Sequence, residues 1–176
     1  MALSILKDLF LPADGMTIGE LMNVDEVRAS KGYGCGVQLE KTFFEIKREG
    51  ILDKFKSFFL GKPSLPICYV IFKFKVTSET GHTHTVIIRT DPDFDMRNMY
   101  TNRIQVYCDC PDFMYRSAWS LNRKKALFLN DRVRLELAEA ISNAPKAKTR
   151  LSICCKHTFA AINWVINNYS YLMRGI

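Results

Sequence analysis

The chain has 176 residues, of which 48% are hydrophobic and 12% aromatic, enough for a packed core in one domain or in one domain with an appendage. Its 25 Lys and Arg residues against 18 Asp and Glu residues give a formal net charge of +7. No run of about 18 apolar residues occurs, so we expect no membrane-spanning helix.

Residues 1–63 are predicted to form a helical N-terminal region. Thr17 and Glu20 have the spacing of a capping box at the start of the stretch TIGELMNVDEVRA. From Glu40 to Leu60, aromatic and aliphatic residues recur near helical spacing with lysines between them, which predicts one helix or two helices divided at Gly50.

The apolar stripe of this second helical stretch has two interpretations. It packs into the core, or it forms a basic amphipathic surface that binds a membrane or partner helices. The candidate partner-binding residues are Phe55, Phe58 and Phe59.

Residues 67–110 are predicted to form an antiparallel sheet of three strands, with the sequences ICYVIFKFKV, THTVIIRT and NRIQVYCDC. The segment SETGH supplies the turn between the first two strands. His82 and His84 fall at the tip of this hairpin, and without a third nearby ligand we interpret them as turn residues rather than as a second metal site.

Two pairs of potential metal ligands form the most informative pattern in the chain. Cys108 and Cys110 make a CxC pair, and Cys155 and His157 make a CxH pair after 44 intervening residues. Residues two apart on a strand point to the same face, and a ligand in the first turn of a helix lies near the positive end of the helix dipole. Three thiolates and one imidazole suit one zinc ion, and a closed four-ligand set predicts a structural site.

Two alternatives to this assignment remain open. Cys154 lies beside Cys155 and could replace it, although the CxH spacing favours Cys155. The second alternative is a group of ordinary buried cysteines with an unrelated histidine.

A CxC pair on a strand, an insert, and a CxH pair at a helix start resemble the SWIM-type zinc finger. The resemblance covers residues 102–173, and the string CDCPDFMYRSAW with the later CKH is similar to a variant in small proteins encoded by tailed bacteriophages. The insert between the CxC pair and the CxH pair is longer than in typical members of the family. The resemblance implies a module that binds DNA or protein, and its phage variant implies a virion component.

The insert carries almost all of the excess positive charge. Residues 116–150 hold nine Lys and Arg and three acidic residues, a net of +6. They could neutralise nucleic-acid phosphates, with Tyr115 and Trp119 available for base stacking, or they could be solvated helix faces. The candidate nucleic-acid-binding residues are Arg116, Arg123, Lys124, Lys125, Arg132, Arg134, Lys146, Lys148 and Arg150.

The sequence therefore predicts an α+β fold with N-terminal helices, a three-stranded antiparallel sheet and zinc-clipped C-terminal helices. The helical region 1–63 would precede a SWIM-like zinc-binding domain over residues 64–176. Six cysteines that include a CxC pair and two adjacent thiols indicate a reducing compartment, the cytoplasm, or the virion for a phage protein.

No catalytic constellation can be identified, so we expect neither an enzyme nor a small-molecule substrate. The predicted function is that of a structural or assembly protein stabilised by one Zn²⁺, a component of the neck, tail, baseplate or capsid interior of a tailed-phage particle that packs on other protein subunits. The alternative is a DNA- or RNA-binding module that uses the basic insert.

Overall fold

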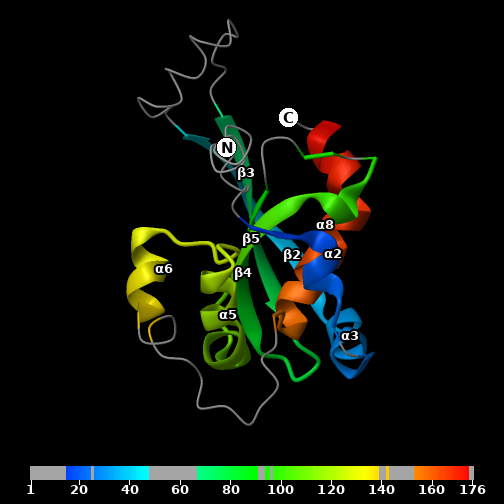
Figure 1. Ribbon diagram of the computed structural model, residues 1–176. Helices are drawn as coiled ribbons and strands as arrows, with labels where there is room; N and C mark the ends of the chain where they lie inside the picture. Colours follow the sequence, from blue (N-terminus) through cyan, green and yellow to red (C-terminus); the bar gives the residue numbers. More distant parts are fainter. Residues whose placement is uncertain are drawn as a thin grey trace, which may run out of the picture.

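The computed structural model describes residues 15–24, 26–47, 67–90, 94–95, 97–138, 142 and 153–174. Within them, a five-stranded antiparallel sheet has the order β1-β5-β4-β3-β2 (Figure 1). The strands are β1 (Met16–Thr17), β2 (Gly36–Lys47), β3 (Ile67–Thr77), β4 (Thr83–Thr90) and β5 (Arg103–Cys108).

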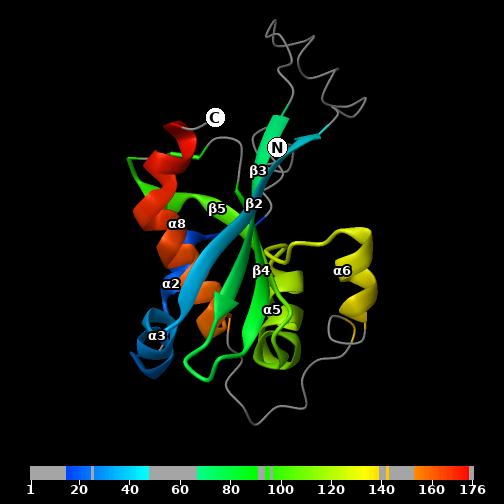
Figure 2. The same ribbon diagram turned by 180° about the vertical axis from the view of Figure 1, so that it is seen from behind.

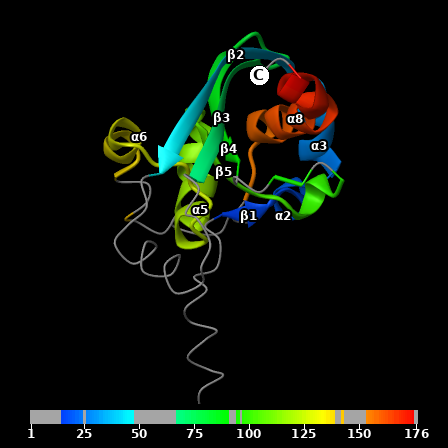
Figure 3. The ribbon, with the colours of Figure 1, turned by 90° about the horizontal axis from the view of Figure 1, so that it is seen from above.

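Helices lie on both faces of this sheet. Seen from above, α2, α3 and α8 lie on one side, and α5 and α6 lie on the other (Figure 3). None of the described helices combines the length and the apolar character needed to cross a membrane. The helical elements are α2 (Ile18–Met22), α3 (Glu26–Tyr33), the 3₁₀ turn η1 (Met99–Thr101), the π-helical segment η2 (Phe113–Ser117), α5 (Ala118–Arg123), α6 (Asp131–Glu136) and α8 (Lys156–Arg174).

The long helix α8 packs across the centre of the sheet. Alternate residues of β3 face it: the ring of Phe74 lies 5.3 Å from that of Trp164, and Phe72 lies 6.2 Å from Tyr169. Phe72 and Phe74 are completely buried, as is Val106 on β5. Since apolar burial is the main favourable term in folding, this layer holds α8 against the sheet.

The basic insert is hydrogen-bonded to the edge of β5 that faces away from β4. The N–H of Val106 donates to Ala126 O at 2.9 Å, and the N–H of Phe128 donates to Val106 O at 3.0 Å. Residues 126–128 therefore extend the sheet by a short parallel pairing beside β5. Helix α6 follows. Val133 on this helix and Leu137 just after its end are both buried.

The prediction of a three-stranded sheet is wrong, because β1 and β2 add two strands. Strand β1 is only two residues long and has no sequence signal of its own. In β2, half-buried Val37 and Leu39 alternate with exposed Gln38 and Glu40, a strand pattern that begins before the stretch predicted as helical.

Part of the helical prediction for residues 40–60 is therefore also wrong, since residues 40–47 belong to β2. This strand pairs with β3 from Gly36↔Thr77 to Lys47↔Ile67, so the sheet joins residues from both sides of the predicted boundary at residue 63. The candidate partner-binding residues Phe55, Phe58 and Phe59 lie outside the described residues.

The capping box at the start of α2 is confirmed. The Thr17 side-chain oxygen accepts a hydrogen bond from Glu20 N at 3.2 Å, and Thr17 N donates to Glu20 Oε2 at 2.9 Å. The predicted single helix is divided, because α2 ends at Met22 and α3 begins at Glu26.

Helix α3 approaches the first turns of α8 closely because Gly32 has no side chain. A Cβ atom at Gly32 would lie 2.5 Å from Phe159 Cδ1 and 3.2 Å from the carbonyl oxygen of Lys156. The ring of Tyr33 meets Phe159 edge-on, with centroids 5.2 Å apart. Gly32 therefore sets the distance between the two helices.

We predict that Gly32→Ala lowers the free energy of unfolding of the protein. Overpacking against buried Phe159 costs about 1–3 kcal/mol, and it outweighs the roughly 0.5–1 kcal/mol that alanine contributes to a helix. Urea denaturation measures the change. Gly36→Ala is the matched control, because its Cβ would meet no atom within 4 Å. Equal stability of the two variants would contradict this role of Gly32.

Candidate metal centre

The structure brings together Cys108, Cys110, Cys155 and His157, the four residues that the motif spacing selected. Their potential ligand atoms all lie within 4.8 Å of one another, and all four side chains are buried. In tetrahedral coordination with Zn–S bonds of about 2.3 Å, neighbouring sulfurs are about 3.8 Å apart. The four groups could therefore hold one metal ion after small adjustments.

Two structural elements supply the ligands. Cys108 ends β5 on the same face as Val106, so its side chain points toward the α8 layer. Cys110 follows just before η2. Cys155 immediately precedes α8, and His157 lies in the first turn of that helix. The site thus joins the end of β5, an inner strand of the sheet, to the start of the longest described helix.

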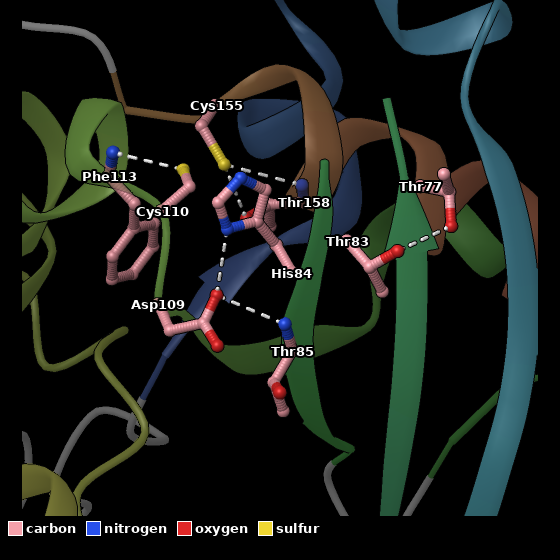
Figure 4. Close-up of polar contacts among 9 residues, drawn as sticks. All are labelled: Thr77, Thr83, His84, Thr85, Asp109, Cys110, Phe113, Cys155 and Thr158. Atoms are coloured by element: carbon pink, nitrogen blue, oxygen red, sulfur yellow. Dashed lines mark hydrogen bonds and ion pairs between the residues drawn. The ribbon is translucent and has the colours of Figure 1, made fainter. Parts of the chain in front are cut away.

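Backbone groups near the helix starts donate hydrogen bonds to two of the sulfurs (Figure 4). Phe113 N donates to Cys110 Sγ at 3.3 Å, and Thr158 N donates to Cys155 Sγ at 3.4 Å. The Thr158 hydroxyl lies 3.1 Å from Cys155 Sγ. Such contacts orient metal ligands and stabilise negative charge on sulfur.

The three thiols differ in their pKa values: those of Cys108 and Cys110 are raised, and that of Cys155 is lowered. Burial, with the neighbouring sulfurs, raises the pKa of Cys108 well above its ordinary value. The Cys108 thiol lowers the pKa of Cys110, but Cys155 and burial raise it more. Burial also raises the pKa of Cys155, yet Cys108, Cys110 and Thr158 lower it more, to a value well below normal. Metal binding must therefore displace protons from Cys108 and Cys110, so acid weakens it.

His157 supplies the observation that best tests whether a metal fits. The residue is 4% exposed, and neither ring nitrogen has a hydrogen-bond partner among the described residues. A buried polar atom without a partner costs about 1–3 kcal/mol. Coordination of an ion by one nitrogen, beside three sulfurs, would satisfy that atom.

Cys155 rather than Cys154 belongs to the cluster. Cys154 is also fully buried, but its Sγ donates weakly to the Cys155 carbonyl oxygen at 3.5 Å. Burial raises the pKa of Cys154 well above its ordinary value. The geometry therefore agrees with the CxH spacing.

The sequence did not indicate that His84 lies beside the metal centre. Its ring centroid is 4.4 Å from that of His157, and its Nδ1 lies 3.1 Å from Asp109 Oδ1. The same carboxylate oxygen accepts from Thr85 N at 3.0 Å (Figure 4). The register Val86↔Cys108 carries the start of β4 to the Cys110 end of β5, information that a single sequence does not contain.

The candidate nucleic-acid-binding residues are spread over several places. Arg116 lines a cavity next to the metal centre, and Arg132 lines a different cavity on the α6 side of the sheet. The Arg123 guanidinium lies 5.0 Å from the centre of the Trp119 ring. The other described members are Lys124, Lys125 and Arg134, while Lys146, Lys148 and Arg150 lie outside the described residues.

No known protein family, curated protein or solved structure matches this chain. The four-residue cluster is consistent with a zinc finger. The assignment of the cluster to the SWIM type therefore rests on the CxC…CxH motif alone.

We predict that Cys155→Ala lowers zinc content well below one ion per chain. Only three ligands remain in this variant, and the buried thiol that ionises most readily is lost. Cys154→Ala, the matched control, should retain one ion. Elemental analysis of the dialysed proteins measures both. Loss of zinc in the Cys154 variant, with normal content in the Cys155 variant, would reverse the assignment of the ligand.

Proposed function

We propose that the protein is a non-enzymatic structural or assembly protein stabilised by one Zn²⁺. The observation that carries this proposal is the buried set of three sulfurs and one imidazole, whose atoms lie within 4.8 Å of one another. Four protein ligands complete a tetrahedral zinc shell and leave no position for a catalytic water. Zinc would then act by clamping β5 to α8.

The exposed edge of the sheet supports a role in assembly. Strand β2 is 12 residues long and lies at the end of the strand order (Figure 2). No described strand pairs with its outer edge. Phe43 and Phe44 on this strand are 44% and 50% exposed. Long edge strands with apolar side chains pair readily with another chain, so β2 is the surface we propose for contact with other subunits.

The resemblance of the CxC…CxH motif to SWIM-like phage proteins favours a place in a tailed-phage particle. The neck, tail, baseplate and capsid interior are the sites at which such a compact component would pack on its neighbours. This assignment goes beyond the metal centre and rests on the motif.

A second candidate function is binding of DNA or RNA by a SWIM-type module. Tyr115 is 75% exposed beside Arg116, and Arg123 stacks on Trp119. Aromatic side chains interleaved with cations are typical of surfaces on which bases stack and phosphates bind.

The assembly proposal predicts that the zinc-loaded protein self-associates with rising concentration in sedimentation velocity. Phe44→Glu should abolish this association, because it puts a charge into an apolar contact. Tyr100→Glu is the matched control, since Tyr100 is 56% exposed on η1, away from β2. A wild-type protein that stays monomeric, or equal association of both variants, would contradict a role for the β2 edge.

A further inference from the structure

A cavity of ≈ 320 Å³ lies beside the metal centre, where α3, η2 and the start of α8 meet. Cys110 and His157 form part of its wall. We propose that this cavity binds a terminal phosphate group. Four cationic side chains line it and would hold the anion: Arg28, Lys31, Arg116 and Lys156.

The charge around the cavity selects a ligand of high negative charge. Asp112 is the single acidic side chain among the described residues that line the cavity, against four cationic side chains. A phosphate monoester carries about −1.5 to −2 at neutral pH and offers three strong acceptor oxygens, so it suits several cationic donors at once better than a carboxylate does.

Helix packing fixes two of the cations over the start of α8. Arg28 and Lys31 are three residues apart on α3, so their side chains share one side of that helix. The close contact of Gly32 with Phe159 and the Lys156 carbonyl holds this part of α3 against α8. The backbone of α3 at Arg28 and Lys31 is therefore held close to the start of α8.

The remaining groups suit an anion as well. Asp112 Oδ1 lies 3.2 Å from Arg116 Nε, an interaction that orients the guanidinium and leaves its other N–H groups to donate. The planar guanidinium fork matches the geometry of phosphate oxygens. Helix α8, 19 residues long, begins at Lys156 on the cavity wall, and the positive end of its dipole favours an anion there.

This site goes beyond the proposed assembly function and does not depend on self-association through β2. Isothermal titration calorimetry of the zinc-loaded full chain with inorganic pyrophosphate tests it directly. Lys31→Gln and Arg116→Gln should each weaken binding by about tenfold or more, as expected for the loss of a charge-assisted contact. Zinc content measured after each titration should stay at one ion per chain.

Lys124→Gln is the matched control. Lys124 belongs to the basic insert, as Arg116 does, but it does not line the cavity. Its affinity for pyrophosphate should stay within about twofold of wild type, since exposed charges contribute little. No binding by the wild-type protein, or an equal loss in the Lys124 and Lys31 variants, would overturn the pocket.

Competition distinguishes the two sources of such a phosphate. Single-stranded DNA with a 5′-phosphate should displace pyrophosphate better than the same strand with a 5′-hydroxyl if the ligand is a nucleic-acid end. Displacement by neither strand, with pyrophosphate binding still dependent on Lys31, would identify a small phosphorylated compound as the ligand of the same pocket.

Discussion

The junction between the end of β5 and the start of α8 is the contact on which the described structure depends. Cys108 and Cys110 come from the strand side, and Cys155 and His157 come from the helix side. Forty-four residues separate the two pairs in the sequence, and the described helices among them, α5 and α6, lie on the other face of the sheet, so no short chain connection holds the two ends together. Four coordinate bonds to one ion would supply that connection, and structural zinc contributes free energy of folding directly.

The same junction organises its surroundings. Helix α8 carries the aromatic residues that pack on β3, and its first turn receives α3 at Gly32. Because α3 is fixed there, its cations surround a cavity whose wall includes two of the proposed ligands. A candidate metal site, a helix packing contact and a basic cavity thus share the start of one helix, and a change in any of them should affect the others.

The sequence was a good guide where a pattern is local. The three strands from residue 67 onward follow from β-branched and aromatic runs bounded by turns, and the CxC and CxH spacings alone selected the four residues of the cluster. Strand β2 was misassigned in part because phenylalanines after its bulge at Leu39/Lys41 mimic helical spacing. Two exposed neighbours, Phe43 and Phe44, do not alternate as strand residues usually do.

Features that depend on register could not be predicted. His84 reaches the candidate metal centre through the pairing of β4 with β5, and Arg28 reaches the cavity beside it through the packing of α3 on α8. In the insert, the spacing of Met114, Ala118 and Leu121 would put them on one face of a regular α-helix. The π-helical turn instead buries Phe113 with Ala118 and Leu121 and leaves Met114 half-buried, because the wider turn shifts the buried side by one residue.

Amide hydrogen exchange before and after treatment with a metal chelator would show whether a bound ion holds α8 against the sheet. We expect the amides of the first turns of α8, around His157 to Ala161, to lose protection strongly. The amides of Phe72 and Phe74 in the middle of β3 should keep most of theirs, since the sheet has its own apolar core. Unchanged protection at the start of α8 after complete loss of metal would contradict the claim that the four residues clamp this helix to the sheet.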